Sequence, residues 1–427
     1  MAKVSVIGAG YVGLTTAACL SSLGHDVCIS ESNNFKVELI QKGKSPISEP
    51  GREELISVGL AENRLKIISD NLAAVKESEF IFICLPTPQS GDGSADISIV
   101  ESFISSAKAA IPKNCILVTK STMPVGSALK LSRLLKRDDV HMVSNPEFLR
   151  EGSAVYDTLN PERVVVGAAN REAAEKVAKL YGSLKSEVII TDSHSAEIVK
   201  YAANAFLATK VSFINSISTL CELYDGDINK VKHALGADSR IGSKFLQPGP
   251  GWGGSCFPKD TAALVRISDD VGFNFEILKA TIESNKSHQR RVTKQILEMI
   301  PNSTDATVAV LGLAFKAGTD DVRDSPAIEI IEQLLSRGVK VNTYDPVVNA
   351  ANLNFVNGSV GSTKSAVDAT RDSDAIVVLS EWPEFADLDP AAMAPSMRNL
   401  NIFDVRGIID SDKWLSCGFT VKAIGKK

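Results

Sequence analysis

One cysteine in a glycine-rich segment is the clearest candidate for chemistry in this sequence. Residues 249–260 read GPGWGGSCFPKD, so four glycines in six positions precede Ser255 and Cys256. Such a segment lets the backbone pass close to a ligand, and Pro258 is suited to the first turn of a helix. A cysteine at a helix N-terminus and close to Lys259 is expected to form a thiolate readily, and the thiolate is the nucleophile. We therefore predict that Cys256 reacts covalently with a substrate.

The other six cysteines fit a structural role. They lie mostly among apolar residues and form no C-x-x-C pair, so neither a disulfide framework nor a zinc site is indicated. None of the five histidines falls in the motif segments, which argues against a histidine-based dehydrogenase and a histidine-ligated metal. We expect no bound metal, and packed thiols at Cys19, Cys28, Cys84, Cys115, Cys221 and Cys417.

A dinucleotide-binding motif follows the first predicted strand. The residues Gly8, Ala9, Gly10, Tyr11, Val12 and Gly13 come directly after Val4–Ile7 and open a segment of small residues. Gly8 permits a tight turn, Gly10 lets backbone N–H groups approach a pyrophosphate, and Gly13 lets the helix pack close to the sheet. Glu31 ends the second predicted strand, where it would bind ribose hydroxyls and repel a 2′-phosphate. The motif predicts NAD rather than NADP, and nearby Lys36 weakens that preference slightly.

Polar residues also stand out in three other segments. Lys200 and Asn204 are spaced i, i+4 in an apolar, Ala-rich helical stretch, where a cation and an amide could stabilise an oxyanion. Glu147 and Glu151 lie in NPEFLREG after a predicted strand and would share a face if that segment were helical. Thr122 follows another strand, which places it near the cofactor crevice.

The last third of the chain carries three cations near predicted strand ends. Lys316, Arg323 and Arg406 stand where open α/β sheets bind ligands, and their charge suits a phosphate-bearing group. The segment from Gly312 has one glycine where the first motif has three. We therefore expect this region to bind something other than a second dinucleotide.

The apolar pattern predicts the elements that must position these residues. Short β-rich runs alternate with amphipathic stretches over the first 190 or so residues and again after residue 303, which is typical of doubly wound sheets. Between them, residues 195–223 form a long run without Pro or Gly. The predicted fold is α/β: two Rossmann-like domains, residues 1–192 and 303–427, joined by a long central helix and a helical region over residues 193–302. Expected strands are Val4–Ile7, Asp26–Ser30, Phe80–Leu85, Ile116–Thr119, Val140–Ser144, Val164–Val166, Val308–Leu311, Lys340–Tyr344, Ala375–Leu379 and Asn401–Phe403.

Composition excludes several classes of protein. The 427 residues are 44% hydrophobic and 23% charged, which is ordinary globular composition. The net charge is −5 without a basic block, so binding to nucleic acid or to an anionic membrane is not expected. The longest apolar run is too short to span a bilayer, and the N-terminus lacks the pattern of a signal peptide, so we expect a cytoplasmic location.

The motifs taken together resemble the UDP-glucose/GDP-mannose dehydrogenase family over nearly the whole chain. The blocks are GAGYVGL from Gly8, KSTMPVG from Lys120, NPEFLREG from Asn145, KYAANAFLA from Lys200, SRIGSKFL from Ser239, GWGGSCFPKD from Gly251 and FKAGTDDVRDSP from Phe315. The resemblance implies an NAD-binding N-terminal domain, a helical dimerisation core and a C-terminal UDP-binding domain. It therefore implies a homodimer that binds a UDP-sugar.

The resemblance also implies roles for individual residues. Cys256 would be the nucleophile, Lys200 and Asn204 would stabilise oxyanions, Asp260 and Thr122 would hold a water, and Glu147 would assist thioester hydrolysis. Cofactor contacts are implied for Gly8, Gly10, Tyr11, Val12, Gly13, Glu31, Lys36, Thr87, Thr122, Glu151 and Arg323. Substrate contacts are implied for Glu147, Phe148, Leu149, Glu151, Lys200, Asn204, Arg240, Phe245, Gly251, Gly253, Phe315, Lys316 and Arg406, with Arg240 reaching the partner subunit's sugar nucleotide.

The implied reaction is the oxidation of UDP-glucose to UDP-glucuronate, a precursor for polysaccharide biosynthesis, by two NAD-dependent steps through a thiohemiacetal and a thioester. Another nucleotide sugar, a UDP-N-acetylhexosamine or GDP-mannose, remains an alternative substrate. A single-step β-hydroxyacid dehydrogenase would need no cysteine, and a non-catalytic nucleotide-sugar-binding protein would not need Cys256 and Lys200. Two departures from the family pattern are Trp252, expected to affect the sugar pocket, and Glu31, where aspartate is commoner.

Overall fold

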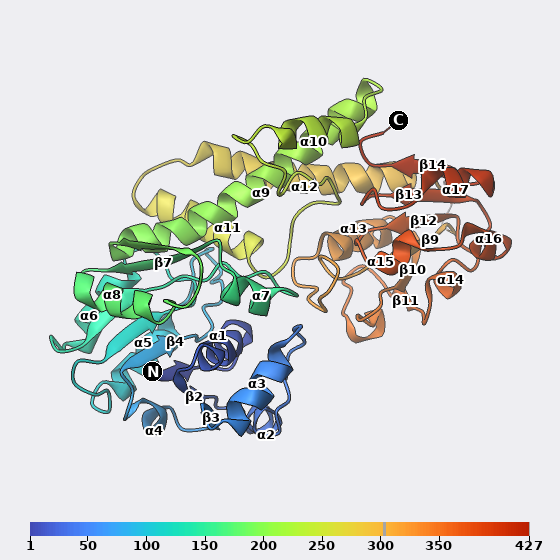
Figure 1. Cartoon of the computed structure of the whole chain (residues 1–427). Helices are drawn as coiled ribbons and strands as arrows, with labels where there is room; N and C mark the ends of the chain where they lie inside the picture. The colour runs from blue at the N-terminus through green and yellow to red at the C-terminus, as the bar shows by residue number, and fades with distance from the viewer. Residues whose placement is uncertain (302–304, 427) are drawn as a thin grey trace. The chain divides into compact units, whose positions relative to one another are not determined.

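The computed structural model describes residues 1–301 and 305–426 and separates into two compact units (Figure 1). Unit 1 comprises Met1–Ala203 and Ala262–Gly272, and unit 2 comprises Asn204–Thr261 and Phe273–Lys427. The division runs through two helices, α9 (Ser193–Leu223) and α11 (Phe257–Asp270).

Unit 1 is built on an eight-stranded sheet with the order β3-β2-β1-β4-β5-β6-β7-β8. All neighbouring strands are parallel except β6 and β7, which pair antiparallel. The inner strands are almost entirely buried, as expected for strands that are covered on both faces. The strands are β1 (Lys3–Ile7), β2 (Asp26–Ser30), β3 (Leu65–Ile68), β4 (Phe80–Ile83), β5 (Ile116–Thr119), β6 (His141–Ser144), β7 (Arg163–Ala168) and β8 (Glu187–Thr191).

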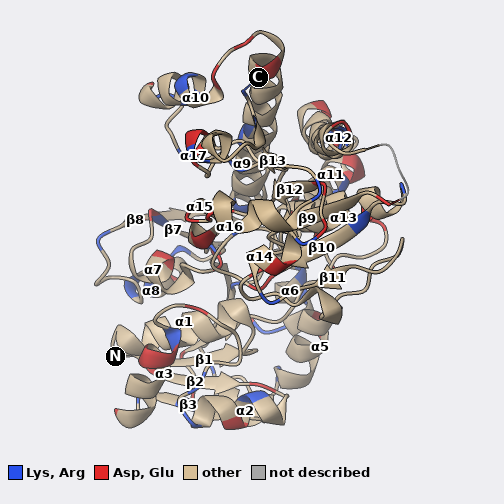
Figure 2. Ribbon diagram, turned by 90° about the vertical axis from the view of Figure 1, so that its right-hand side faces the viewer, with Lys and Arg blue, Asp and Glu red and all other residues tan. Residues whose placement is uncertain are grey.

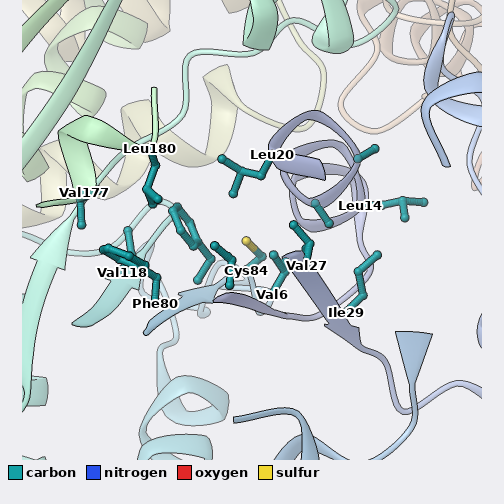
Figure 3. Packing of buried hydrophobic residues seen from close by; sticks show 14 of the residues in the cluster. Val6, Leu14, Leu20, Val27, Ile29, Phe80, Cys84, Val118, Val177 and Leu180 are labelled. Atoms are coloured by element: carbon teal, nitrogen blue, oxygen red, sulfur yellow. The ribbon is translucent and has the colours of Figure 1, made fainter. Parts of the chain in front are cut away.

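Two apolar clusters pack on opposite faces of this sheet. One cluster joins residues of α1, α2, α3 and α8 to alternate strand residues such as Val6, Phe80 and Val118 (Figure 3). The other joins α4, α5 and α6 to the intervening residues Ile7, Ile83 and Leu117. The alternation follows from the two-residue period of a strand. The helices are α1 (Tyr11–Ser22), α2 (Asn34–Gln41), α3 (Arg52–Ala61), α4 (Asn71–Val75), α5 (Ser98–Ala107), α6 (Ser127–Leu135), α7 (Ala154–Leu159) and α8 (Arg171–Lys179).

Unit 2 contains a six-stranded sheet in which all neighbouring strands are parallel, with the order β11-β10-β9-β12-β13-β14. Helices α12 and α13 pack on one face, and α14 to α17 pack on the other. The strands are β9 (Thr307–Leu311), β10 (Lys340–Tyr344), β11 (Gly361–Ser362), β12 (Ala375–Val378), β13 (Asn401–Asp404) and β14 (Thr420–Ala423). The helices are α10 (Ile228–Ala237), α12 (Glu276–Leu297), α13 (Pro326–Leu335), α14 (Ala366–Ala369), α15 (Pro383–Ala386), α16 (Pro390–Met393) and α17 (Ser411–Ser416).

The prediction of two Rossmann-like α/β sheets is confirmed, and four strands are present that the sequence analysis did not predict. These strands, β3, β8, β11 and β14, occupy the two edges of each sheet. Every residue of β8 and β14 is at least partly exposed, so their sequences lack the continuous apolar character of the inner strands.

Charges of both signs are interspersed along the ribbon of each unit (Figure 2). Several exposed pairs are one helical turn apart, as Glu172 and Lys176 are on α8, with 2.8 Å between the charged atoms. Among residues 1–301 and 305–426, no helix is both long and apolar enough to cross a membrane.

Candidate active site

The glycine motif of unit 1 has the geometry that a dinucleotide requires. It lies at the carboxyl end of β1, next to β4, where the strand order reverses. Gly8 has φ = +98°, and a β-carbon on Gly13 would lie 1.9 Å from the Gly8 carbonyl oxygen. A β-carbon on Gly10 would meet no atom within 4 Å, and the N-terminus of α1 has no side-chain cap. The absence of a side-chain cap and the space beside Gly10 fit a pyrophosphate bound by backbone N–H groups of the first turn of α1.

Glu31 is fixed beside this motif, directly after β2. Its carboxylate accepts hydrogen bonds from the N–H groups of Ala9 at 3.1 Å and Asn33 at 3.0 Å. The Lys36 ammonium lies 3.9 Å from Glu31 Oε2. The carboxylate thus stands where the ribose of a dinucleotide is held in this fold, and Lys36 is paired with it.

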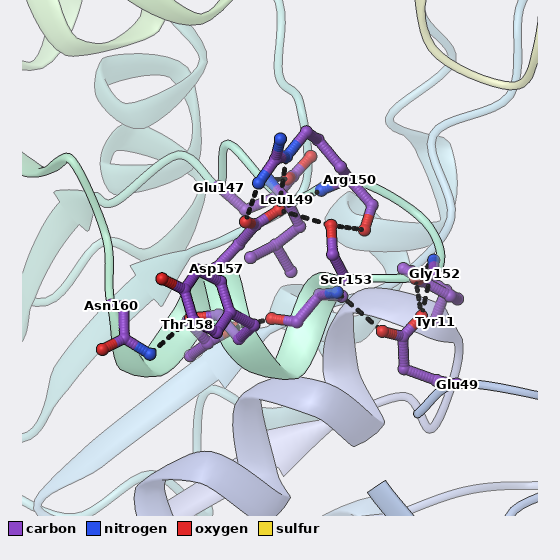
Figure 4. Close-up of polar contacts among 12 residues, drawn as sticks. Tyr11, Glu49, Glu147, Leu149, Arg150, Gly152, Ser153, Asp157, Thr158 and Asn160 are labelled. Carbon is purple, nitrogen blue, oxygen red and sulfur yellow. Dashed lines mark hydrogen bonds and ion pairs between the residues drawn. The ribbon is translucent and has the colours of Figure 1, made fainter. Parts of the chain in front are cut away.

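Tyr11 connects the glycine motif to the NPEFLREG segment (Figure 4). Its hydroxyl donates a hydrogen bond to Glu49 and accepts one from the Gly152 N–H at 3.0 Å. Glu49 also accepts from the N–H groups of Gly152 at 2.9 Å and Ala154 at 2.6 Å. Burial and the Glu49 carboxylate raise the pKa of Tyr11, so the phenol stays protonated. Glu49 was not predicted from the sequence, where the only indication is an acidic residue before Pro50 and Gly51.

The NPEFLREG segment is not helical between residues 145 and 150. Glu147 and Glu151 therefore do not share one face of a helix. Glu147 instead forms a buried ion pair with Lys200 of α9, with 2.8 Å between Oε1 and Nζ. Its other oxygen accepts from the Leu149 N–H at 2.6 Å. Burial opposes ionisation of Glu147, but Lys200 and the Leu149 N–H outweigh it and hold its pKa below the usual value. The carboxylate is therefore ionised at neutral pH.

Other predicted residues of unit 1 gather near this pair. Thr122 and Lys200 line one small pocket, together with Thr119, Ser121, Met123, Ser144, Pro146 and Glu197. The Thr87 hydroxyl donates to the Thr122 carbonyl oxygen at 3.0 Å. The Phe148 ring lies 5.7 Å from Lys200 Nζ and 3.9 Å from the Arg163 guanidinium. Because Thr87, Thr122 and Phe148 follow β4, β5 and β6, the parallel sheet brings them to one edge.

A second buried lysine in unit 1 was missed as a site residue, although it begins the KSTMPVG block. Lys120 donates to Asn145 Oδ1 at 3.0 Å, and Asn145 also accepts from the Tyr181 hydroxyl at 2.7 Å. Burial lowers the pKa of Lys120 to about 8, with Glu147 nearby acting in the opposite direction. Lys120 therefore contributes positive charge next to the Glu147 carboxylate.

In unit 2, Cys256 lies directly before α11 and is partly exposed. Asp260 is buried one turn further on and accepts from Asn204 Nδ2 at 2.6 Å and Lys259 Nζ at 2.7 Å. The structure thus joins Asn204 to Asp260, and the partner of Lys259 is this carboxylate.

Burial affects the ionisation of five other cysteines. Burial raises the pKa of Cys19, Cys84 and Cys115 to about 12 and also raises the pKa of Cys28 and Cys221. These thiols stay protonated at neutral pH, as the expected structural role requires.

The loop glycines are also needed for packing within unit 2. A β-carbon on Gly253 would lie 1.9 Å from the Asp324 carbonyl oxygen, and one on Gly254 would lie 2.9 Å from the Phe315 ring. On Gly251 it would lie 2.8 Å from Asn285 Oδ1. The missing side chains therefore face other parts of unit 2, and glycine is needed so that the loop can pack against the protein.

Trp252 is likewise part of this packing. It is 7% exposed, and its indole N–H donates to Ser212 Oγ on α9 at 2.8 Å. The tryptophan anchors the loop to a helix, and its expected influence on the sugar pocket stays a prediction.

Arg406 and Phe315 meet next to the loop. The Arg406 guanidinium donates to the carbonyl oxygens of Leu379 at 2.8 Å and Phe315 at 3.0 Å, and it pairs with Glu381 at 3.2 Å. Burial lowers the pKa of Arg406, although the group stays charged. The Lys316 ammonium lies 5.5 Å from the Phe315 ring centre.

The second sheet does not repeat the dinucleotide site. In unit 1, α1 begins four residues after β1 ends, whereas α13 begins fifteen residues after the end of β9. Asp345, which follows β10, accepts from the N–H groups of Leu313 at 2.8 Å and Ala314 at 3.2 Å. These amides are engaged within the protein, so the prediction of a different ligand agrees with the geometry.

Three predicted contacts in unit 2 lie on its surface or in strained backbone. The Arg240 side chain is 87% exposed and pairs with Asp238. Arg323 is 67% exposed and pairs with Asp321. Phe245 has φ = +63°, and its ring lies 6.2 Å from that of Phe257.

Comparisons with known proteins match this organisation. The NAD-binding, central and UDP-binding domains of the UDP-glucose/GDP-mannose dehydrogenase family match residues 2–185, 194–287 and 309–411. The chain is 38% identical to UDP-glucose 6-dehydrogenase YwqF of Bacillus subtilis, over all of this chain and 98% of that protein. It is similar to the structure of a UDP-glucose dehydrogenase from Pyrobaculum islandicum, with 32% identity, a TM-score of 0.89 and coverage of 100% and 98%. It is also similar to a UDP-D-ManNAc dehydrogenase from Pyrococcus horikoshii, with 28% identity, a TM-score of 0.89 and 99% coverage of both chains.

The chain belongs to the UDP-glucose/GDP-mannose dehydrogenase family. It is an NAD-dependent nucleotide-sugar dehydrogenase, and the glycine motif at the start of α1 is the site whose geometry fits NAD.

Proposed function

We propose that this protein oxidises UDP-glucose to UDP-glucuronate, with Cys256 as the covalent nucleophile. The main support is full-length similarity to curated UDP-glucose 6-dehydrogenases at 37–39% identity. The family's UDP-binding domain at residues 309–411 supports a UDP-sugar as the substrate class. We also place the reaction in the cytoplasm and the product among the acidic sugars used in polysaccharides.

The proposed reaction removes two hydrides from the sugar 6-position, and bound NAD supplies the hydride acceptor in each oxidation. The Cys256 thiolate adds to the aldehyde carbon, and loss of the second hydride leaves a thioester on sulfur. Water then breaks the C–S bond and returns the thiol. In total, the alcohol and one water become a carboxylate, two hydrides are transferred and three protons are released.

Contacts within each unit support roles for individual side chains. Lys200 carries a positive charge balanced by Glu147, so it can stabilise an oxyanion while Glu147 remains ionised and able to accept a proton from water. Asn204 presents an amide fixed by Asp260, and Asp260 with Thr122 is proposed to hold a water. The ammonium of Lys259 neutralises the charge of the Asp260 carboxylate in the first turn of α11.

The runner-up substrate is a UDP-N-acetylhexosamine, because the similar structure from Pyrococcus horikoshii is a UDP-D-ManNAc dehydrogenase. A panel of UDP-glucose, UDP-N-acetylhexosamines and GDP-mannose assayed for NAD reduction separates these possibilities. We expect the highest kcat/KM with UDP-glucose. A clear preference for an N-acetylated or GDP-linked sugar would overturn the proposed substrate and leave the mechanism intact.

The role of Cys256 is tested by the product balance. The intact enzyme should form two NADH per sugar and release little aldehyde. Cys256→Ala should lose almost all acid formation yet bind NAD and UDP-glucose with near-normal affinity, because the thiol adds little to ground-state binding. Cys256→Ser should also fail, since a hydroxyl ionises poorly at neutral pH. Uronate formation by Cys256→Ala at a rate near wild type would disprove the thioester route.

We further propose a homodimer formed through α9. Phe206, Phe213 and Leu220 are spaced by seven residues and are 66%, 53% and 49% exposed. This spacing places them on one face of the helix, and Leu223 and Tyr224 extend the exposed apolar surface. Phe213→Glu should therefore shift the protein to monomers in sedimentation equilibrium, whereas Lys176→Glu, at an exposed position on α8, should not.

Arg240 is proposed to complete the site of the partner subunit. Mixing Arg240→Ala protein with Cys256→Ala protein should restore part of the activity, because each hybrid dimer carries one intact site. Absence of recovery despite measured subunit exchange would indicate that each site is built from one chain.

A further inference from the structure

The backbone around Trp252 is held by a buried amide that the proposed reaction does not use. Asn285 of α12 accepts a hydrogen bond from the Trp252 N–H and donates one to the Trp252 carbonyl oxygen, both at 2.9 Å. Asn285 is 6% exposed. One side chain thus pairs with both polar groups of one residue, as a neighbouring strand would, and fixes the peptide planes on both sides of it.

Both backbone groups of Gly249 are also held by buried side chains, here from two residues. Its N–H donates to Asn215 Oδ1 at 2.9 Å, and its carbonyl oxygen lies 2.8 Å from His288 Nε2, which must be the donor in this contact. Asn215 and His288 are buried. Asn285 and His288 are three residues apart on α12, and Ser212 and Asn215 are three residues apart on α9, so each helix presents one face to the loop.

The loop cannot use ordinary secondary structure for these bonds. Residues 247–253 are neither helix nor strand, and their buried polar groups need partners from side chains. Gly251 has φ = +127°, and a β-carbon there would approach Asn285 Oδ1 to 2.8 Å, so the close contact requires glycine. The segment anchored in this way ends three residues before Cys256.

We propose that Asn285 is a positioning residue for Cys256: by holding both backbone groups of Trp252, it fixes where the nucleophile stands at the start of α11. The inference rests on the proposed function only for the role of Cys256. Because misplacement of a reacting atom by about 1 Å can lower a rate about 100-fold, loss of this anchor should affect the reaction more than ligand binding.

The experiment compares Asn285→Ala and Asn285→Asp with Lys286→Ala, an exposed neighbour on α12. Asn285→Asp has nearly the same shape and keeps an acceptor for the Trp252 N–H but loses the donor to its carbonyl oxygen. We expect kcat to fall about 10- to 100-fold in Asn285→Ala and less in Asn285→Asp, with the Kd for UDP and for NADH within about twofold of wild type. Lys286→Ala should match wild type.

A second readout does not require turnover. The rate at which iodoacetamide alkylates Cys256 is followed by peptide mass spectrometry across pH, and its midpoint should move to higher pH in both Asn285 variants because the thiol loses its fixed place at the helix N-terminus. A folded Asn285 variant with wild-type kcat and a wild-type alkylation profile would overturn the inference. Failure of wild type to oxidise UDP-glucose would instead refute the proposed function, while the alkylation profiles would still test Asn285.

If Asn285→Ala does not fold, Asn285→Asp carries the test by itself. A merely structural role predicts that its melting temperature and ligand affinities fall while kcat per folded molecule and the alkylation midpoint stay unchanged. That outcome would also overturn the inference.

Discussion

Removal of the Lys200 ammonium should destabilise unit 1 strongly. The Lys200 and Glu147 side chains are only 4% and 8% exposed and lie 2.8 Å apart. Lys200→Met keeps most of the side-chain volume but leaves a buried carboxylate without its closest cation. Breaking one partner of such a pair costs about 3–5 kcal/mol at neutral pH. Glu147→Gln combined with Lys200→Met should recover most of this loss, because no buried charge then lacks its partner.

The loss of unfolding free energy in Lys200→Met should be larger at neutral pH than at acidic pH. In the wild type, the pKa of Glu147 is lower folded than unfolded, so its contribution is present above the unfolded pKa of about 4.3 and is lost as pH falls through the folded value. In Lys200→Met, burial prevails and the folded pKa rises above the unfolded one. The carboxyl then favours folding at low pH, and this contribution is lost as pH increases. The difference in unfolding free energy between the variant and the wild type should therefore be largest near pH 7 and decrease toward pH 4.

The assay must follow unit 1 specifically. All three tryptophans, Trp252, Trp382 and Trp414, lie in unit 2, so their fluorescence does not report on unit 1. Hydrogen exchange by mass spectrometry on peptides of β5 and β6 measures the opening of the relevant sheet. The control is Lys176→Met, which removes an exposed i, i+4 pair and should cost under about 0.5 kcal/mol. If Lys200→Met lowered the unfolding free energy of unit 1 by less than about 1 kcal/mol, and equally at pH 5 and pH 7.5, this reasoning would be refuted.

Three further predictions concern other parts of the site. Glu31→Ala should narrow the difference in kcat/KM between NAD and NADP, and equal use of both cofactors by the wild type would contradict the role given to Glu31. Gly253→Ala should displace the loop and reduce kcat at least about 100-fold, because its β-carbon would lie 1.9 Å from a carbonyl oxygen; Gly91→Ala, where the β-carbon meets nothing within 4 Å, is the matched control. Tyr11→Phe should destabilise unit 1 by about 1–3 kcal/mol, as measured by hydrogen exchange, since Glu49 loses a buried donor. An unchanged exchange rate around residues 150–154 would show that the hydrogen bond between Tyr11 and Glu49 does not stabilise this segment.

The sequence determined the inner strands of both sheets and the position of the dinucleotide motif. Those strands are buried on both faces, so they need continuous apolar residues, and Gly8 and Gly13 stand where only glycine fits the turn and the close packing of α1. The long helix α9 was also readable from a run without Pro or Gly. The edge strands were not, because β8 and β14 are partly exposed along their whole length and carry mixed sequences.

Only the tertiary structure decided which polar groups act on one another. Lys200 and Glu147 are 53 residues apart in sequence, and Asn204 and Asp260 are 56 apart, so no local spacing could pair them. The glycines before Cys256 indicated a close approach of the backbone, and the structure shows that their missing side chains face Asp324, Phe315 and Asn285. A glycine in the sequence can indicate that a side chain would not fit at that position. Only the folded structure shows which neighbouring atoms exclude it.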